Sequence, residues 1–356
     1  MKLRPKKVAI MVLNFNGMRW LAKCFSSVMK TDYPRYDVYL IDNGSADGSV
    51  AYVAKEFPSV KVIQNMRNLG YSEAYNSATK QVDADYYVLL NNDTEVLTSS
   101  WVSELVSIAE SERRVGAVTC KMVAAADHGE LDSVGGMGIP FWRGFVDIGR
   151  GERDRGQYDR FEPFAFCGGA ALIRKEAFAQ VGGFDERLFM YVEDVDLSWR
   201  LRLACWSIRL APSAKVAHYL GGTMGRTVTP MKLYYCHRNL LRLILKNCDG
   251  SLPWAVFSYL AFTAMMILGF SLFEPRRAII VLRTLAWNLN KLPNTMKYRR
   301  LVQIQRRVDD DTITRLMYPP IPRYQPAEHV ILRRILNLFF ERASRFLFFN
   351  RNHIPT

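Results

Sequence analysis

The chain has 356 residues, of which 49% are hydrophobic, so it can fill one large domain and a smaller one and is not disordered by composition. Its formal net charge is +14, but residues 1–228 carry 28 Lys/Arg against 27 Asp/Glu, whereas residues 229–356 carry 20 against 7. The near-neutral first 228 residues count against a nucleic-acid-binding domain there. Six cysteines without a CxxC pair count against a structural zinc site or a disulfide framework.

Short apolar runs alternate with amphipathic stretches over the first 119 residues. The pattern predicts strands at 8–13, 38–41, 60–63, 86–90 and 115–119, and helices at 18–29, 49–57, 72–81 and 101–111. This alternation is typical of βαβ units and predicts an α/β fold with a mostly parallel sheet. Residues 127–163 are rich in Gly, Asp and Arg and show little periodicity, which predicts a mobile loop near the site.

The character of the chain changes after about residue 228. Residues 252–273 contain no charged side chain, and a helix of that length is roughly 33 Å long, enough to cross a bilayer. Sixteen Lys/Arg follow this stretch, so a single crossing would put the basic tail on the wrong side of the membrane. A hairpin, re-entrant or in-plane arrangement avoids this. Residues 332–347 predict a basic amphipathic helix suited to an anionic leaflet, or alternatively one packed on its own domain.

Three polar turns follow predicted strands, at the sheet edge where open α/β proteins bind ligands. In the first, Phe15 is suited to stacking on a base or to ordinary core packing. In the second, Asp42 is suited to accepting a hydrogen bond from a base, although a helix-capping turn explains the same residues. In the third, Asn91-Asn92-Asp93, the Asp93 carboxylate is the hard oxygen ligand that Mg²⁺ or Mn²⁺ prefers. A capped turn is the alternative there.

An acidic cluster and one histidine complete the set. Glu193, Asp194 and Asp196 lie within four residues, and carboxylates this close together are costly unless the protein uses them. A solvated helix start, favoured by the helix dipole, is the other interpretation. His218 needs independent support, since a single histidine is more often structural than a ligand. The chain has no GxGxxG or GxxxxGK[ST] pattern, so neither a dinucleotide fingerprint nor a P-loop accounts for these turns.

In this order and spacing, the segments resemble the inverting GT-A glycosyltransferases of family 2, especially the rhamnosyltransferase-like and galactofuranosyltransferase-like branch. The matching segments lie within residues 6–226 and read VLNFNG, LIDNGSADGS, NMRNLGYSEAYN, LLNNDTEV, CGGAALIRKEAFAQVGGFDERLFMYVEDVDLSWRLR and VAHYLGG. The resemblance implies a Rossmann-like GT-A domain over residues 1–228 that binds a nucleotide-sugar. A basic, apolar, helical, membrane-associated region over residues 229–356 would follow it.

The resemblance also implies roles for individual residues in binding the nucleotide. Phe15 and Asp42 would contact the base, Asn68 and Gly70 would line the nucleotide pocket, and Asn92 would lie near the ribose.

The residues that would carry the chemistry follow from the same comparison. The triplet that ends in Asp93 stands at the DxD position of the family, with Asn91 in place of the first carboxylate. Asp93 and His218 would hold Mg²⁺ or Mn²⁺. Asp194 matches the catalytic base, and Glu193 is its acidic neighbour.

The predicted enzyme adds one sugar to a lipid-linked or cell-envelope glycan at the cytoplasmic face of the bacterial inner membrane, as a peripheral or monotopic protein. By branch, dTDP-L-rhamnose is the first-choice donor, and UDP-galactofuranose or another UDP-hexose comes next. A polyprenyl-phosphate sugar synthase is the enzymatic alternative, whereas a processive synthase lacks support because no Q/RxxRW motif is present. The non-enzyme alternatives are a nucleotide-sugar-binding protein and a basic membrane- or nucleic-acid-binding protein. An anionic membrane surface is the expected partner, no nucleic acid is expected, and the oligomeric state is open.

Overall fold

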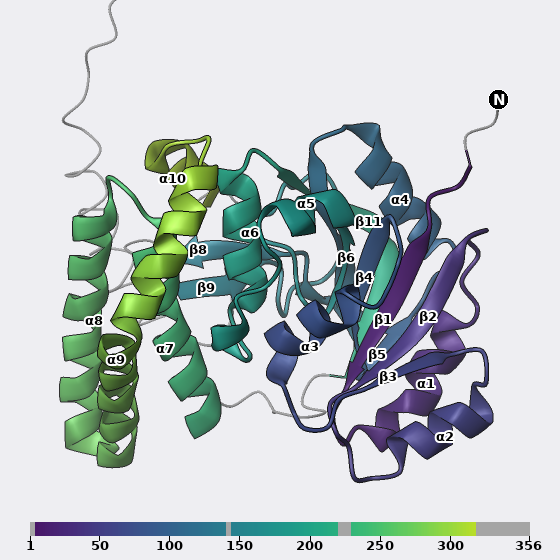
Figure 1. The fold of residues 1–356 in the computed structure, drawn as a ribbon, viewed down its shortest axis with the longest axis horizontal. Coiled ribbons are helices and arrows are strands. Elements are labelled where there is room, and N and C mark those ends of the chain that lie inside the picture. Colours follow the sequence, from purple (N-terminus) through teal and green to yellow (C-terminus); the bar gives the residue numbers. More distant parts are fainter. Residues whose placement is uncertain (1–3, 140–143, 220–228, 318–356) are drawn as a thin grey trace, which may run out of the picture. The chain divides into compact units, whose positions relative to one another are not determined.

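The structure is a computed structural model that describes residues 4–139, 144–219 and 229–317. Its main sheet is built from β1 (Val8–Asn14), β2 (Tyr36–Asp42), β3 (Lys61–Gln64), β4 (Tyr86–Asn91), β5 (Thr94–Val96), β6 (Val115–Ala124), β7 (Asp127–Ser133), β10 (Ala170–Arg174) and β11 (Ser207–His218). Eight of these nine strands lie in the order β3-β2-β1-β4-β10-β6-β11-β5, and the ninth, β7, pairs with β6 (Figure 1).

The first four strands of that order, from β3 to β4, are parallel to one another, and β6 is parallel to β11. β10 lies between β4 and β6 and is antiparallel to both. The predicted α/β fold with a mostly parallel sheet is therefore confirmed. Because β1, β2 and β4 run in one direction, the turns that follow them meet at one edge of the sheet, as the sequence predicts.

Helices cover both faces of the sheet. The residues of β1 alternate between them, so Val8, Ile10 and Val12 pack with α1 (Met18–Val28) and α4 (Trp101–Ser111). Ala9 and Met11 pack on the other face with α3 (Gly70–Thr79) and α5 (Lys175–Gln180). A short helix, α2 (Ser49–Glu56), follows β2. Burial on both faces explains why these strands read as continuous apolar runs.

A further helix, α6 (Glu193–Leu203), lies between the sheet and a C-terminal group of helices (Figure 1). That group consists of α7 (Pro230–Asn247), α8 (Leu252–Phe273), α9 (Pro275–Gln305) and α10 (Asp310–Met317). Leu197 and Leu201 of α6 belong to the core on the sheet, while Val195 and Leu203 belong to a core shared with these helices. Helix α6 is thus buried from both directions. The predicted boundary at residue 228 falls in a stretch outside the described residues and stays a prediction.

The predicted mobile loop over residues 127–163 is wrong for much of its length. The segment contains β7 and a two-stranded sheet made of β8 (Gly136–Ile139) and β9 (Gly144–Asp147). Asp132 and Ser133 are buried at the end of β7. β7 is mostly polar, and β8 and β9 have four residues each, so none of them gives a readable apolar period. β7 pairs with β6.

The predicted apolar helix over residues 252–273 is present as α8, and it is the one helix in the described residues that is long and apolar enough to cross a membrane. Only Ala255, Tyr259 and Thr263 of α8 are buried. Large apolar side chains are exposed along the whole helix: Trp254, Phe257, Leu260, Met265, Leu268, Leu272 and Phe273. After Glu274 the chain enters α9, which packs against both α8 and α7. The predicted amphipathic helix at 332–347 lies outside the described residues.

Candidate active site

Asn14 joins the polar turns that follow β2 and β4. It ends β1, the strand between those two, and its Nδ2 donates to Asp42 Oδ1 at 3.1 Å. Asn92 Nδ2 donates to Asn14 Oδ1 at 2.6 Å. The predicted base-binding and ribose-binding residues Asp42 and Asn92 are therefore brought together by a residue that the sequence comparison did not single out.

The two residues predicted to contact the base differ in exposure. The Phe15 residue is 43% exposed, so its ring is free to stack on a planar ligand. Asp42 is fully buried, and its Oδ2 accepts a hydrogen bond from Ser45 N at 2.9 Å. A base contact by Asp42 would therefore add a second hydrogen bond to an oxygen that already has one. Both roles stay predictions.

Asn68 and Gly70 form a tight turn beside the same edge of the sheet. Asn68 Oδ1 accepts from Gly70 N at 2.8 Å and from Asn43 Nδ2 at 3.3 Å. Gly70 has φ +74°, and a Cβ at this position would lie 2.4 Å from the carbonyl oxygen of Phe189. The turn predicted to line the nucleotide pocket thus packs directly on the segment that leads to the predicted base, and glycine is required at position 70.

His218, at the end of β11, is placed between two carboxylates. Its Nε2 lies 3.5 Å from Asp93 Oδ1, and its Nδ1 lies 2.7 Å from Asp132 Oδ2. The Tyr219 amide donates to the Asp93 carbonyl at 2.9 Å, which fixes the backbone of the two turns together. Burial alone would lower the pKa of His218, but hydrogen bonds to Asp132 and Asp93 raise it to about 9.

This arrangement fits a divalent cation. A histidine that binds a metal usually donates its other ring N–H to a carboxylate, as His218 Nδ1 can to Asp132. The ring nitrogen that faces Asp93 would then exchange its proton for the cation. Among the described residues no three His, Cys, Asp or Glu side chains form a ligand group. Asp93 and His218 would therefore leave coordination positions for phosphate oxygens and water.

Asp194 is the one residue of α6 that is not buried. Its Oδ2 accepts from Gly168 N at 3.0 Å, and its Oδ1 accepts from Val195 N at 2.8 Å. Removal of water from its surroundings raises the pKa of Asp194 to about 6, against the effect of these hydrogen bonds. The carboxylate therefore changes protonation close to neutral pH, which suits a group that exchanges a proton with a substrate.

Glu193 behaves differently from its neighbour. It is buried, and burial together with the charge of Asp194 raises the pKa of Glu193 well above its ordinary value. Within the described part of the chain its Oε2 has no hydrogen-bond partner. Both observations favour a neutral carboxylic acid beside an ionisable one.

Two glycines connect Asp194 to the turn that contains Asp93. Gly168 donates its amide to Asp194, and its carbonyl accepts from Tyr71 OH at 2.6 Å. The next carbonyl, that of Gly169, accepts from Asn91 N at 3.0 Å. A Cβ on Gly168 would lie 3.0 Å from the Tyr71 hydroxyl oxygen and 3.3 Å from Asp194 Cβ. The predicted base and the predicted metal turn are therefore held in one hydrogen-bonded unit.

A comparison with protein families decides the class of this unit. The family model described as Glycosyl transferase family 2 matches residues 9–182, which include the strand-end turns and both glycines. Residues 9–182 form a family 2 glycosyltransferase domain. The resemblance inferred from the sequence is confirmed at the level of the family.

Relatives and solved structures agree with this assignment. An N-acetylglucosaminyl-diphospho-decaprenol L-rhamnosyltransferase of Mycobacterium tuberculosis is 29% identical over 269 residues, which are 67% of this chain and 86% of that protein. The O-antigen biosynthesis protein RfbC of Myxococcus xanthus is 27% identical over 222 residues, 59% of this chain and 17% of that protein.

Two solved structures share the fold. The mannosyltransferase PcManGT from Pyrobaculum calidifontis, in complex with GDP-Man and Mn²⁺, has a TM-score of 0.51 at 14% identity over 85% of this chain and 87% of that chain. The S. aureus TarS 1–349 structure in complex with UDP-GlcNAc has a TM-score of 0.54 at 16% identity over 87% of this chain and 90% of that chain. The GT-A fold expected for the glycosyltransferase domain is confirmed.

The candidate site also contains residues that the sequence did not reveal. Asp132 orients His218, and Arg150 pairs with Asp132 at 3.2 Å and with Asp147 at 2.8 Å. The charge of Asp147 contributes to the raised pKa of Asp194, so this chain of charges extends from the histidine to the base. All three residues lie in the segment predicted as a loop. The sequence signal for these residues is an Asp-rich stretch. That signal can be interpreted only when the pairing of β7 with β6 is known.

Proposed function

We propose that this protein is an inverting glycosyltransferase that moves one sugar from a nucleotide-diphospho-sugar to a hydroxyl of a lipid-linked or cell-envelope glycan. The observation that carries the proposal is Asp194, the one residue left partly open on an otherwise buried helix, with a pKa of about 6. It is tied through Gly168 and Gly169 to the strand-end turn with Asp93. A carboxylate so placed is a general base rather than part of a salt bridge.

The chemistry follows from the environment of each carboxylate. Asp194 takes the proton of the acceptor hydroxyl as the hydroxyl oxygen attacks the anomeric carbon. Attack from the face opposite the leaving diphosphate inverts the configuration at that carbon. Glu193, buried and neutral, does not compete as a second base.

Asp93 and His218 would hold Mg²⁺ or Mn²⁺ in this function, with Asp132 fixing the orientation of the imidazole. When bound, the cation supplies positive charge that stabilises the diphosphate leaving group, so no protein acid is needed there. Asn92, Asn68 and Gly70 would bind the nucleotide around the edge of the sheet, and Phe15 and Asp42 would contact its base.

The donor of first choice is dTDP-L-rhamnose, supported by the 29% identical relative named as a rhamnosyltransferase. UDP-galactofuranose or another UDP-hexose is the next choice, and a polyprenyl-phosphate sugar synthase is the alternative reaction. A donor panel scored by release of nucleoside diphosphate, with Mg²⁺ and Mn²⁺ compared against EDTA, tests the proposal. Turnover of one donor that EDTA abolishes is expected. Binding of nucleotide-sugars without release of diphosphate from any donor would instead support a nucleotide-sugar-binding protein.

The proposed location is the cytoplasmic face of the bacterial inner membrane, where residues 229–356 would hold the enzyme as a peripheral or monotopic protein. The exposed apolar side chains of α8 support this, because contiguous exposed apolar surface is rare on monomeric soluble proteins. The basic residues that follow α8 suit an anionic leaflet.

Flotation of the full-length protein with anionic and neutral vesicles tests the location. Leu268→Glu and Leu272→Glu, which place charge on the exposed face of α8, should abolish flotation. Met66→Glu is the matched control, since Met66 is a fully exposed apolar residue of the sheet domain. Equal flotation of all variants would contradict a membrane role for α8.

A further inference from the structure

One face of α7 carries polar side chains that are buried. We call four of them the α7 clamp: Arg238, Asn239, Arg242 and Lys246. The last three lie 1, 4 and 8 positions after Arg238, so all four share one side of the helix. None is more than 6% exposed. Arginine and lysine are almost never this buried unless another element supplies partners.

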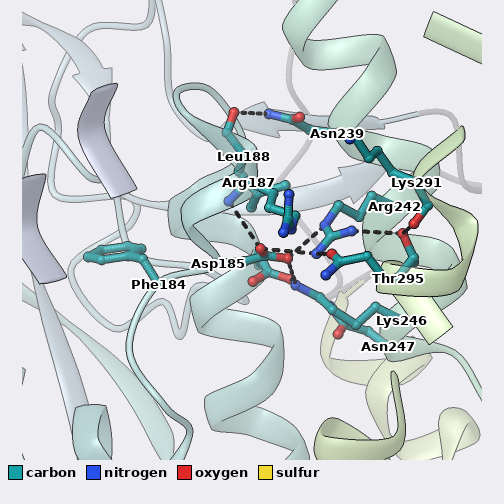
Figure 2. Close-up of polar contacts among 12 residues, drawn as sticks. Phe184, Asp185, Arg187, Leu188, Asn239, Arg242, Lys246, Asn247, Lys291 and Thr295 are labelled. Carbon is teal, nitrogen blue, oxygen red and sulfur yellow. Dashed lines mark hydrogen bonds and ion pairs between the residues drawn. The ribbon is translucent and has the colours of Figure 1, made fainter. Parts of the chain in front are cut away.

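The clamp has carboxylate and carbonyl partners between Asp185 and Asp196, and Arg242 also donates to Thr295 and Asn294 of α9. Arg242 donates from Nε and Nη2 to the Asp185 carboxylate at 2.8 and 3.1 Å, and Lys246 Nζ donates to Asp185 Oδ2 at 2.7 Å (Figure 2). Lys246 Nζ also lies 2.7 Å from Asp196 Oδ1. The clamp thus holds both ends of the segment from Asp185 to Asp196.

Asn239 holds the middle of this segment. Its Nδ2 donates to the carbonyl oxygens of Leu188, Met190 and Tyr191 at 3.0, 3.0 and 2.8 Å, and the bond to Leu188 is drawn in Figure 2. Arg238 Nη2 donates to the carbonyl of Leu188 at 2.8 Å. Two adjacent side chains of α7 therefore donate hydrogen bonds to the backbone carbonyls of the residues that precede Glu193.

That backbone requires support. Phe189, Tyr191 and Val192 have φ of 64°, 66° and 66°, a region that side-chain-bearing residues rarely adopt. Such residues persist where the surroundings determine their conformation, and they gather at functional sites. The two residues that follow Val192 are Glu193 and Asp194. A relaxed backbone here would turn the Asp194 carboxylate away from Gly168.

We infer that the α7 clamp positions the catalytic base, with Asn239 and Arg238 holding the strained backbone from Leu188 to Val192 that aims Asp194 at the acceptor. The inference rests on the proposed function of Asp194. Asn239 is a positioning residue, because it contacts only the backbone of the segment. The C-terminal helices then serve catalysis through α7 and expose their apolar surface through α8.

The kinetic test compares two buried asparagines in the full-length protein. Asn288 lies on α9 and donates to the carbonyls of Arg238 and Thr284, with no bond to residues 185–196. Asn239→Leu should lower kcat about 100-fold, the effect expected from a base displaced by about 1 Å, and leave the nucleotide dissociation constant unchanged. Asn288→Leu should keep kcat near that of the wild type at a similar loss of Tm. An equal fall of kcat in both variants would assign Asn239 a purely structural role and overturn the inference.

A second measurement does not depend on turnover and uses the milder Asn239→Ser, so it also covers a Leu variant that fails to fold. Asp196 N donates to the Val192 carbonyl at 2.9 Å, and Gly168 N donates to Asp194. Hydrogen exchange at these two amides should accelerate at least about tenfold in Asn239→Ser, while the amides of β1 keep their wild-type rates. Unchanged exchange at both amides would overturn the inference. Absence of turnover in the wild type would instead refute the proposed function, and the exchange result would still decide whether Asn239 holds this segment.

Discussion

The segment from Asp185 to Asp196 contains two pairs of carboxylates in opposite environments. Asp185 and Asp196 face α7 and its cations, and although burial alone would raise their pKa values, Lys246, Arg242 and Arg200 hold those pKa values below the ordinary range. Asp194 accepts the Gly168 amide and Glu193 is buried beside it; among the described residues no salt bridge joins either to a cation, and their pKa values are raised.

The difference teaches that position in the fold, not residue type, decides which carboxylate can react. Asp194 and Asp196 are two residues apart on one helix. Within residues 4–139, 144–219 and 229–317 the first accepts hydrogen bonds from backbone amides alone, whereas the second forms ion pairs with Lys246 and Arg200. A paired, permanently ionised carboxylate stabilises the fold. An unpaired carboxylate with a pKa near 6 is available to move a proton.

The largest expected effect is on turnover in Asp194→Asn. Loss of the base should lower kcat by about 10³-fold or more, while nucleotide binding survives because Asp194 has no part in it. Release of nucleoside diphosphate and calorimetric titration with nucleotide measure the two quantities. Asp83→Asn is the control, since Asp83 is an exposed carboxylate paired with Lys175 and should have no effect. Equal loss of binding and turnover in Asp194→Asn would mean that Asp194 is structural.

The next effect is on stability in Asp185→Asn. Arg242 would be left buried without a carboxylate and Lys246 with Asp196 alone, so the free energy of unfolding should fall by about 3 kcal/mol. Denaturant unfolding of the full-length protein measures it. A change no larger than that of Asp83→Asn would contradict the assignment of Asp185 as the fold-stabilising member of the comparison.

A smaller effect is expected for metal affinity in Asp132→Asn. The variant removes the charge that fixes the imidazole of His218, so Mn²⁺ affinity should fall about 10- to 100-fold. Titration with Mn²⁺ in the presence of nucleoside diphosphate measures it, with the exposed His128→Ala as the control. Unchanged affinity in Asp132→Asn would exclude His218 as a ligand oriented by Asp132.

The smallest change comes from pH. Asp194 must be ionised to act as a base, so kcat should fall about tenfold for each pH unit below about 6 and level off above it. The pKa values of the paired carboxylates are shifted in the opposite direction, so they protonate at a lower pH than Asp194. The pKa values of Asp185 and Asp196 are depressed in the folded protein, so their stabilisation is present at neutral pH and is lost as the pH falls through those folded-state values. Activity should therefore decline at a higher pH than stability, and a coincident loss of both would contradict the distinction.

Much of the fold was predictable from the sequence. Strands buried on both faces read as continuous apolar runs, so β1, β2, β4 and the helices between them were predicted to within a few residues. The antiparallel insertion of β10 was not, because its partners β4 and β6 lie far away in the chain. The strands β7 to β9 were not predicted either, although β7 pairs with the preceding β6 and β8 with the following β9. Their residues carry no apolar period of their own.

The site was predictable where its residues end regular strands. Asp93 and His218 were predicted as separate motifs, and the structure places their side chains 3.5 Å apart. The sequence grouped Asp196 with Glu193 and Asp194 as one acidic cluster. Arg200, one turn after Asp196, is a local partner that the sequence contains. The packing of α6 against α7 adds the second partner, and Lys246 lies 50 positions further along the chain, so its contact with Asp196 leaves no local signal.

The most direct test of this account is a ¹³C NMR titration of the aspartate carboxylates in the full-length protein, assigned with Asp194→Asn, Asp185→Asn and Asp196→Asn. The account predicts one resonance that titrates near pH 6 and disappears in Asp194→Asn. The resonances of Asp185 and Asp196 should keep the chemical shift of an ionised carboxylate at pH values below the ordinary aspartate pKa. An Asp194 resonance that titrates at the ordinary value or below, like its paired neighbours, would contradict its assignment as the base.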